Sequence, residues 1–414
     1  MKPVKHFDMH KKPKKELYLL TPLAYLLSFP TVWKRKLKVN KVNMDDCRPP
    51  YILLCTHHAF IDFKVTTKAI FPHRANYIVA IDGFIKREWL LRHVGAICKR
   101  KFTSDPLMFR HVKYSLEHLK QIVAIYPEAR YTIVGTQSVL PESLGKMIKV
   151  LKHPVVVLNM HGNYLSQPQW NLRQRKVNLT ADMTQIIKKD EIHQLSVEAI
   201  NERINQAFVY DEYRYQKAHD IHITEPFRAE GLERVLYQCP ECHTAFQMKS
   251  NGAELSCQSC KKTYVLETNG SLRATDGKTT FDHIPDWFEH LKDNVRKEIE
   301  DGTYYFHDDV MIESLPNAKG FIPLGQGKLT HDKHGFLLEW VEDGVPKKLM
   351  KEPLSLYGLH IEYNYMKKGD CIDLSTLDDT YYIYPINHKN VVTKLYFATE
   401  ILYERAYKDL KSTD

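Results

Sequence analysis

A histidine and a carboxylate stand five positions apart in the run Cys55-Thr-His-His-Ala-Phe-Ile-Asp-Phe63, and this pair could do acid–base chemistry. Apolar residues before His57 predict a buried strand, and the residues after Asp62 predict a helix. With His57 ahead of the helix and Asp62 in its first turn, the chain can fold back so that the carboxylate meets the imidazole. Such a pair removes a proton from an alcohol, because the carboxylate orients the ring and stabilises the imidazolium that forms. The pattern is short, and a structural histidine capped by a nearby carboxylate would share it.

The segment from Ile52 to about Asn163 predicts an α/β domain that would position this pair. Apolar runs alternate with stretches of helical spacing, such as 85–93 and 106–120, and this alternation indicates a largely parallel sheet flanked by helices. In open sheets of this class, ligands bind at the carboxyl ends of the strands. The predicted strands are Ile52–Cys55, Tyr77–Ile81, Ala96–Cys98, Gln121–Tyr126 and Pro154–Met160.

Polar residues follow two more of these strands. The cations of residues 99–101 come directly after one strand, and Pro127-Glu-Ala-Arg130 comes after another. A guanidinium suits a bidentate grip on phosphate oxygens, so these segments could hold an anionic ligand. A solvated basic turn would have the same composition as residues 99–101.

In order and spacing, these segments resemble the four blocks of the glycerolipid acyltransferases, which include the lysophosphatidic acid acyltransferases. The family blocks are Asn-His-x4-Asp, Gly-x-Ile-x3-Arg, Phe-Pro-Glu-Gly-Thr-Arg and Val-Pro-Val-x-Pro-Val. Here they would be Thr56 to Asp62, Gly95 to Lys101, Tyr126 to Arg130 and His153 to Val157. The sequence departs from the pattern in having Thr56 for Asn and Ala129 for Gly, and in placing the arginine one position early. The resemblance covers residues 17 to about 165, less than half of the chain.

This resemblance implies a mechanism. His57 would be the general base that takes the proton of an acceptor hydroxyl as it attacks an acyl thioester, and Asp62 would support the imidazole. The acceptor would be a lysophospholipid, most simply 1-acylglycerol-3-phosphate in phospholipid biosynthesis, and the donor would be acyl-CoA or acyl carrier protein. Cations would hold the acceptor's phosphate, and a glutamate would bind its free hydroxyl or hold an arginine in place. The residues implied to bind substrate are Lys99, Arg100, Glu128 and Arg130.

A second histidine superfamily offers another interpretation of the same run. His57-His58-Ala-Phe-Ile-Asp62 also resembles the His-His-x3-Asp motif of the chloramphenicol acetyltransferase and condensation-domain superfamily, where the second histidine is the base. That superfamily expects Gly after the Asp, where this chain has Phe63, and a downstream Asp-Phe-Gly-Trp-Gly type motif that this sequence lacks. His58 is therefore kept only as an alternative base.

Positive charge gathers at the start of the chain. The net charge is +9, and residues 1–40 hold ten Lys or Arg, Lys2 among them, against Asp8 and Glu16. Between the basic blocks, residues 17–33 are apolar and aromatic but short for a membrane span, and two prolines interrupt them. Basic flanks around such a segment fit a helix lying in a membrane interface, and a buried N-terminal helix is the alternative. We therefore expect a cytoplasmic protein, peripheral on the inner face of the membrane.

Four of the eight cysteines form one constellation, the two Cys-x2-Cys pairs Cys239, Cys242, Cys257 and Cys260. The spacing predicts a zinc ribbon in which four thiolates bind one Zn²⁺ and leave no position for water, so the metal would be structural. A redox pair or an iron centre is the alternative. Because few cations surround the ribbon, nucleic acid is not an expected partner. The other cysteines are scattered, which fits a reducing compartment and no disulfide framework.

At 414 residues, with 43% hydrophobic and 26% charged residues, the chain has the composition of a globular protein with room for two or three domains. Short alternating strands and a closing helix after residue 280 loosely resemble a pleckstrin-homology-like barrel. The predicted organisation is a membrane-interface segment (1–40), an α/β acyltransferase domain (41–180), a helical linker or cover (181–235), a zinc ribbon (236–275) and a β-rich domain with a terminal helix (280–414). The competing interpretation is a non-catalytic zinc-ribbon adaptor that uses its basic N-terminus to bind membrane or nucleic acid.

Overall fold

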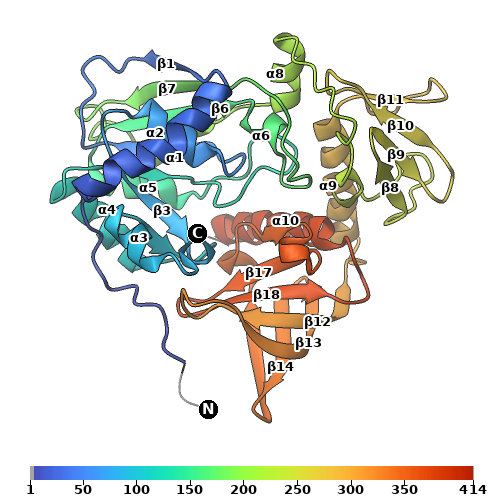
Figure 1. Cartoon of the computed structure of the whole chain (residues 1–414). Coiled ribbons are helices and arrows are strands. Elements are labelled where there is room, and N and C mark those ends of the chain that lie inside the picture. The colour runs from blue at the N-terminus through green and yellow to red at the C-terminus, as the bar shows by residue number, and fades with distance from the viewer. Residues whose placement is uncertain (1–3, 414) are drawn as a thin grey trace.

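Seven strands from the first half of the chain form one sheet in this computed structural model, which describes residues 4–413 (Figure 1). Residues 1–3 and 414, and with them Lys2 of the predicted basic flank, lie outside the described residues. The strands follow the spatial order β1-β7-β6-β2-β5-β3-β4. Their bounds are β1 (Lys38–Val42), β2 (Ile52–Cys55), β3 (Ala75–Ala80), β4 (Ile97–Lys99), β5 (Ile122–Ile125), β6 (Val155–His161) and β7 (Thr180–Ile187).

Parallel pairing dominates this sheet, so the predicted α/β class of this part of the chain is confirmed. β2 lies between β5 and β6 and pairs with both in parallel, with Leu54 opposite Ile125 and Cys55 opposite Leu158. Only the β6–β7 pair is antiparallel. The segments that leave β2, β5 and β6 therefore meet at one edge of the sheet, where an α/β fold places its ligands.

Helices cover both faces of this sheet. Alternate residues of β2 point to opposite faces, so Leu53 joins the core under α1 (Thr21–Lys34) and α2 (Asp62–Ala69). Ile52 joins the opposite core, under α4 (Pro106–Glu117), α5 (Ser143–Leu151) and α7 (Val197–Ala207). Local sequence starts several of these helices: Asp105 accepts hydrogen bonds from two backbone N–H groups of the first turn of α4. The short helices are α3 (Glu88–His93), α6 (Asn163–Ser166) and α8 (Glu212–Ala218).

A four-stranded antiparallel sheet follows, in the order β11-β10-β9-β8. Cys257 ends β9 and Cys260 follows it, whereas Cys239 and Cys242 lie in the loop before β8. The sheet packs against α9 (Ile284–Glu300), where the Trp287 ring lies 5.1 Å from that of Tyr264 on β10 and donates a hydrogen bond to the carbonyl of Gln238 in that loop. Its strands are β8 (Met248–Asn251), β9 (Glu254–Cys257), β10 (Thr263–Leu266) and β11 (Leu272–Ala274).

The last third of the chain forms an open antiparallel sheet of seven strands, in the order β15-β14-β13-β12-β18-β17-β16. The predicted β-rich domain with a terminal helix is therefore present. Among the described residues, no pairing joins β15 to β16, and the resemblance to a pleckstrin-homology-like barrel stays a prediction. The terminal helix α10 (Val392–Thr413) lies between this sheet and the N-terminal domain and packs against α9 (Figure 1). The strands are β12 (Phe306–Ser314), β13 (Ile322–Asp332), β14 (Gly335–Glu342), β15 (Val345–Lys351), β16 (His360–Glu362), β17 (Cys371–Ser375) and β18 (Thr380–Pro385).

The N-terminal apolar segment forms a short 3-10 turn, η1 (Tyr18–Leu20), and then α1. α1 contacts α2 and buries Val32 and Ser28, but most of its apolar side chains face outward. No helix within residues 4–413 is both long and apolar enough to cross a membrane.

Candidate active site

The His57 and Asp62 side chains meet at the carboxyl end of β2. His57 leaves the strand, Asp62 is the first residue of α2, and the intervening turn brings Nδ1 of His57 to 3.0 Å from Oδ2 of Asp62. Because Asp62 accepts the Nδ1 proton, Nε2 is left as the basic nitrogen of the ring. Nε2 has no protein partner among the described residues, and the His57 side chain is 23% exposed. This arrangement can accept a proton from a ligand that enters beside His57.

Four donors surround the buried Asp62 carboxylate. Besides His57, the backbone N–H groups of His58 and Ala59 donate to Oδ2 at 2.6 and 3.0 Å. The amide of Asn163, which follows β6, donates to Oδ1 at 2.8 Å. A carboxylate with this many donors is fixed in one orientation. Asp62 is therefore placed to orient the His57 ring and to stabilise an imidazolium there.

The loop after β5 holds the backbone of His57 on both sides. Glu128 accepts the His57 N–H at 3.0 Å, and the N–H of Thr132 donates to the His57 carbonyl at 2.8 Å. The other Glu128 oxygen accepts from the N–H of Ser138 and the hydroxyl of Tyr210, each at 2.9 Å. Glu128 is fully buried, and its contacts hold the His57 backbone in place. Binding of an acceptor hydroxyl by Glu128 stays a prediction that this geometry does not favour.

Two tyrosine rings flank the His57 imidazole, Tyr126 with its centroid at 4.5 Å and Tyr131 at 4.3 Å. Burial raises the pKa of Tyr131, and the carboxylates of Asp62, Glu362 and Asp82 raise it further. Tyr131 is therefore neutral near pH 7 and lies close to carboxylates of both the N-terminal and the C-terminal domain.

His58 lies on the opposite side of the chain from His57. It is fully buried, its ring packs 4.6 Å from that of Tyr210, and neither ring nitrogen has a hydrogen-bond partner in the described part of the chain. A base in this position would not meet an acceptor hydroxyl, so the structure does not support the second histidine superfamily.

The cations expected to bind phosphate after β4 face the protein. Arg100 is 2% exposed and donates to the carbonyls of Leu315, Pro316 and Asp378 and to the Thr380 hydroxyl, at 2.7 to 3.0 Å. Lys99 donates to the carbonyl of Thr103 at 2.9 Å, and burial lowers its pKa. Arg100 thus anchors the C-terminal domain to the sheet. Phosphate binding by Lys99 and Arg100 stays a prediction. To bind a phosphate, each side chain would have to give up its hydrogen bonds to protein oxygens.

Arg130 is also engaged within the protein. Its guanidinium pairs with Glu400 and donates to the Tyr396 hydroxyl at 2.8 Å, both on α10, and it is 3% exposed. Burial opposes its charge, but Tyr396 and Glu400 more than offset this and raise the Arg130 pKa. The predicted grip of Arg130 on an acceptor phosphate is likewise untested and not favoured by its position.

Sequence reasoning missed several residues that contact or face the dyad. Asn163 and Asp82 each follow a strand of the sheet at its carboxyl end, so the rule that placed His57 could also have indicated them. Tyr210 comes from the predicted linker, and Glu362 and Asp373 come from the C-terminal sheet. No local pattern marks these three, because only the packing of distant segments brings them to the site.

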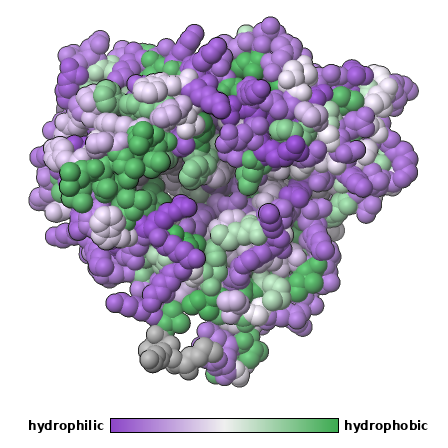
Figure 2. Space-filling view, in the orientation of Figure 1, coloured by the Kyte–Doolittle hydropathy of each residue, from purple (hydrophilic) through white to green (hydrophobic). Residues whose placement is uncertain are grey.

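An exposed apolar surface lies beside the dyad (Figure 2). It combines η1 and the residue before it, the outer face of α1, and aromatic residues before, within and after α2. Phe60, three residues beyond His57, is 64% exposed. Contiguous apolar surface of this kind marks an interaction site in a folded protein. We call it the apolar surface; its members are Leu17, Tyr18, Leu19, Leu23, Leu26, Leu27, Trp33, Phe60, Phe63 and Phe71.

The four paired cysteines come together as the sequence predicts. Their sulfur atoms all lie within 4.8 Å of one another, with 3.7 Å between Cys239 and Cys260 and 3.7 Å between Cys242 and Cys257. Zn–S bonds of about 2.3 Å in a tetrahedron place the sulfurs about 3.8 Å apart, so the cluster fits Zn²⁺. Each Cys-x2-Cys turn is closed by the same hydrogen bond, from the residue after the second cysteine to the carbonyl of the first.

Comparisons with known proteins add little to this geometry. No protein-family model matches the chain, and no curated protein matches it. Among solved structures, the chain is similar to the crystal structure of the 1-acyl-sn-glycerophosphate (LPA) acyltransferase PlsC from Thermotoga maritima, with a TM-score of 0.39 and 10% identity. The likeness covers 46% of this chain and 76% of that one, and a likeness of this degree does not establish a shared activity.

Proposed function

We propose that this protein is an O-acyltransferase that moves a fatty acyl group from a thioester to a hydroxyl of a lysophospholipid. The observation that carries the proposal is the His57–Asp62 contact, in which the aspartate is buried among four donors and the distal imidazole nitrogen is open to a ligand. The four sequence blocks that resemble glycerolipid acyltransferases support the choice of reaction.

In the proposed reaction, Nε2 of His57 removes the proton of the acceptor hydroxyl as its oxygen attacks the thioester carbonyl. The tetrahedral intermediate collapses, the carbon–sulfur bond breaks, and the leaving thiolate takes the proton back from the imidazolium. Asp62 stabilises the imidazolium between these two steps, and Glu128 keeps the His57 backbone in place. The products are the acylated lipid and a free thiol, of coenzyme A or of an acyl carrier protein.

The apolar surface supports a membrane-resident acceptor. Its exposed leucines and aromatic rings can enter a lipid interface, and nearby lysines such as Lys34, Lys64 and Lys68 can meet anionic headgroups. A lysolipid could then keep its acyl tail in the bilayer while its hydroxyl approaches His57. We therefore propose peripheral attachment to the cytoplasmic face of a membrane. The resemblance to lysophosphatidic acid acyltransferases makes 1-acylglycerol-3-phosphate the first acceptor to try.

The test is release of free thiol from an acyl thioester, measured with and without lysophospholipid. We expect acceptor-dependent release by the wild type, a fall of about 10²- to 10⁴-fold in His57→Ala because the general base is lost, and a smaller fall in Asp62→Asn. His193→Ala, which changes an exposed histidine far from the dyad in the sequence, is the matched control and should retain wild-type rates. Wild-type protein that releases no thiol with any lysolipid or donor would favour the adaptor interpretation.

A further inference from the structure

A cluster of charged side chains joins the N-terminal sheet to the C-terminal sheet and is used by no step of the proposed reaction. Asp82, in η2 (Ile81–Phe84), and Lys101 come from segments that follow β3 and β4. His360 and Glu362 lie on β16 and Asp373 lies on β17. Lys101 occupies the last position of the second sequence block, where the acyltransferase family has arginine.

The C-terminal sheet presents its share of the cluster on one face. His360 lies directly opposite Asp373 in the register of β16 and β17, and Asp373 lies opposite Tyr382 of β18. Residues opposite each other in antiparallel strands point to the same side, so these three side chains form a row. Glu362 is two residues from His360 and shares this face.

Within the cluster, the cations are already paired. Nζ of Lys101 lies 3.2 Å from carboxylate oxygens of both Asp82 and Asp373. Nδ1 of His360 lies 2.8 Å from Asp373. Burial opposes ionisation of the two aspartates, but Lys101 and His360 more than offset it, so the pKa of each is lowered.

Glu362 is the carboxyl group without a close counter-charge. Its nearest cationic partner is Nε2 of His360, at 3.6 Å, and burial raises the Glu362 pKa more than His360, Lys101 and the Gln169 amide lower it. Three carboxyl groups thus face one lysine and one histidine, so the fully ionised cluster is negative even when His360 is protonated. A phosphate monoester would add like charge to this pocket.

Two buried atoms of the row also lack partners. Oδ1 of Asp373 and the hydroxyl of Tyr382 have no hydrogen-bond partner among the described residues, although both side chains are about 1% exposed or less. Burial raises the pKa of Tyr382, and the carboxylates of Asp82 and Asp373 raise it further, so this hydroxyl keeps its proton. Buried polar groups are normally satisfied, so the pocket is short of a donor.

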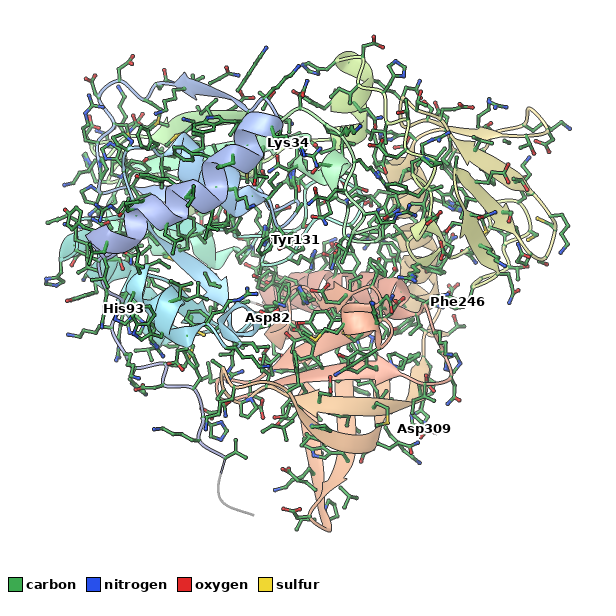
Figure 3. All side chains as sticks on the ribbon, viewed as in Figure 1. Lys34, Asp82, His93, Tyr131, Phe246 and Asp309 are labelled. Atoms are coloured by element: carbon green, nitrogen blue, oxygen red, sulfur yellow. The ribbon has the colours of Figure 1, made fainter. Side chains whose placement is uncertain are left out.

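This donor-poor pocket lies next to the dyad. The Tyr131 ring contacts that of His57, with 4.3 Å between the ring centroids. The carboxylates of Glu362 and Asp82 act on the same tyrosine and raise its pKa. Figure 3 places Tyr131 and Asp82 near each other between the N-terminal domain and α10, and Figure 2 shows the surface hollowed in the same region. The Asp82 and Glu362 side chains are 20% and 19% exposed, so both can be reached by a ligand.

We propose that Asp82 and Glu362, backed by Asp373 and Tyr382, bind the ammonium group of a zwitterionic lysophospholipid. The acceptor would be an amine-bearing lysophospholipid in preference to 1-acylglycerol-3-phosphate. An ammonium brings both the missing positive charge and the missing donors, and it is joined to the reacting glycerol through the phosphodiester. This inference rests on the proposed acyl transfer and names its acceptor class.

The first experiment compares two acceptors with the same acyl chain, 1-acylglycerol-3-phosphate and 1-acylglycerol-3-phosphoethanolamine, in mixed micelles. The wild type should show a kcat/KM at least about tenfold higher for the ethanolamine acceptor, the size expected for one charged hydrogen bond. Glu362→Gln should remove most of this preference and leave the phosphate acceptor unchanged or improved. Glu339→Gln, an exposed change on β14, is the control. Preference of the wild type for the phosphate acceptor, or an equal loss for both acceptors in Glu362→Gln, would overturn the proposal.

The second experiment separates this inference from the acyl transfer itself. Calorimetric titration of His57→Ala with short-chain forms of the two acceptors measures binding without turnover. Tighter binding of the ethanolamine form, lost when Glu362→Gln is added, supports the pocket even if the wild type releases no thiol. Equal binding of both forms overturns the pocket, whereas acceptor-dependent thiol release by the wild type would still uphold the proposed function.

Discussion

A departure from the family pattern proves informative at the scale of single residues. Ala129 stands where glycerolipid acyltransferases have glycine, and it adopts a φ of 57°, in the left-handed region. Its N–H closes a tight turn onto the carbonyl of Tyr126, directly before the segment that holds His57. A left-handed conformation costs a residue with a Cβ atom about 1 to 2 kcal/mol, and glycine avoids this cost. The turn that positions the dyad is therefore kept at some expense of stability.

Ala129→Gly should raise the free energy of unfolding by up to about 1 kcal/mol, since relief of the left-handed strain exceeds the added freedom of the unfolded chain. Denaturant unfolding measures the change. Ala199→Gly, in the first turns of α7, is the opposite control and should lower the free energy of unfolding by about 0.5 to 1 kcal/mol. A destabilised Ala129→Gly would mean that the Cβ atom contributes packing that outweighs the strain.

At the scale of elements, α10 is fastened to the loop that supports the dyad. The Glu400 carboxylate forms ion pairs with Arg130 of that loop and with Lys292 of α9. Nζ of Lys292 lies 2.8 Å from Oε2 of Glu400. Burial opposes ionisation of Glu400, but Lys292 and Arg130 more than offset it, so its pKa is lowered below 4.5. The terminal helix thus contributes to the shape of the site although it lies about 270 residues away in sequence.

Glu400→Gln should lower the free energy of unfolding by about 3 to 5 kcal/mol at neutral pH, because the buried Arg130 and the partly buried Lys292 lose a counter-charge. A carboxyl with a lowered folded pKa stabilises the protein above its unfolded pKa, near 4.5, and this contribution is lost as the pH falls through the lower folded value. The difference between wild type and variant should therefore be constant above pH 5 and shrink below 4.5. Glu404→Gln, at a more exposed position, should cost less than about 1 kcal/mol. Wild-type stability of Glu400→Gln at neutral pH would show that the ion cluster adds nothing.

The ribbon that carries the four-cysteine cluster is the second element with a clear prediction. One equivalent of Zn²⁺ should copurify with the protein, as measured by atomic emission, and Cys239→Ser should lower the zinc content by weakening the site. Chelation should expose the ribbon to proteolysis, whereas Cys47→Ser, at a cysteine outside the cluster, should leave zinc bound. Recovery of iron in place of zinc would identify a different metal centre.

At the scale of the whole molecule, the N-terminal helix and the start of α2 together offer one apolar surface next to the cleft. Basic residues near it make the surface suited to anionic lipid. Membrane binding would therefore bring the dyad to the lipid interface, where an acceptor with a buried tail can reach it.

Wild-type protein should bind vesicles of anionic phospholipid, as measured by flotation, and bind them less well in high salt because screening weakens the lysine contribution. The double change Leu26→Glu and Leu27→Glu should reduce binding by at least about tenfold, since two side chains no longer enter the lipid. Val341→Glu, at an exposed apolar position on β14, should bind like the wild type. Equal binding by all three proteins would exclude the apolar surface as the attachment site.

Much of the fold was predictable because its signals are local. Runs of apolar residues mark β2, β5 and β6, helical spacing marks α4, α9 and α10, and paired cysteines mark the ribbon. The proximity of His57 and Asp62 was predictable for the same reason, since a strand followed by a helix leaves one short turn between them. The sequence by itself therefore determined the α/β class, the cysteine cluster and the geometry available to the dyad.

The tertiary structure alone decided how the charged residues are used. A phosphate site could be built from the cations Arg100, Lys101 and Arg130. In the folded protein, however, their partners are carbonyls and carboxylates of the C-terminal sheet and of α10. Neither the burial of these cations nor the acidic pocket beside Tyr131 has a local signature, because each depends on contacts between residues more than 200 positions apart. Charge spacing in a sequence shows which groups are present, and only packing determines whether their charges remain free for a ligand.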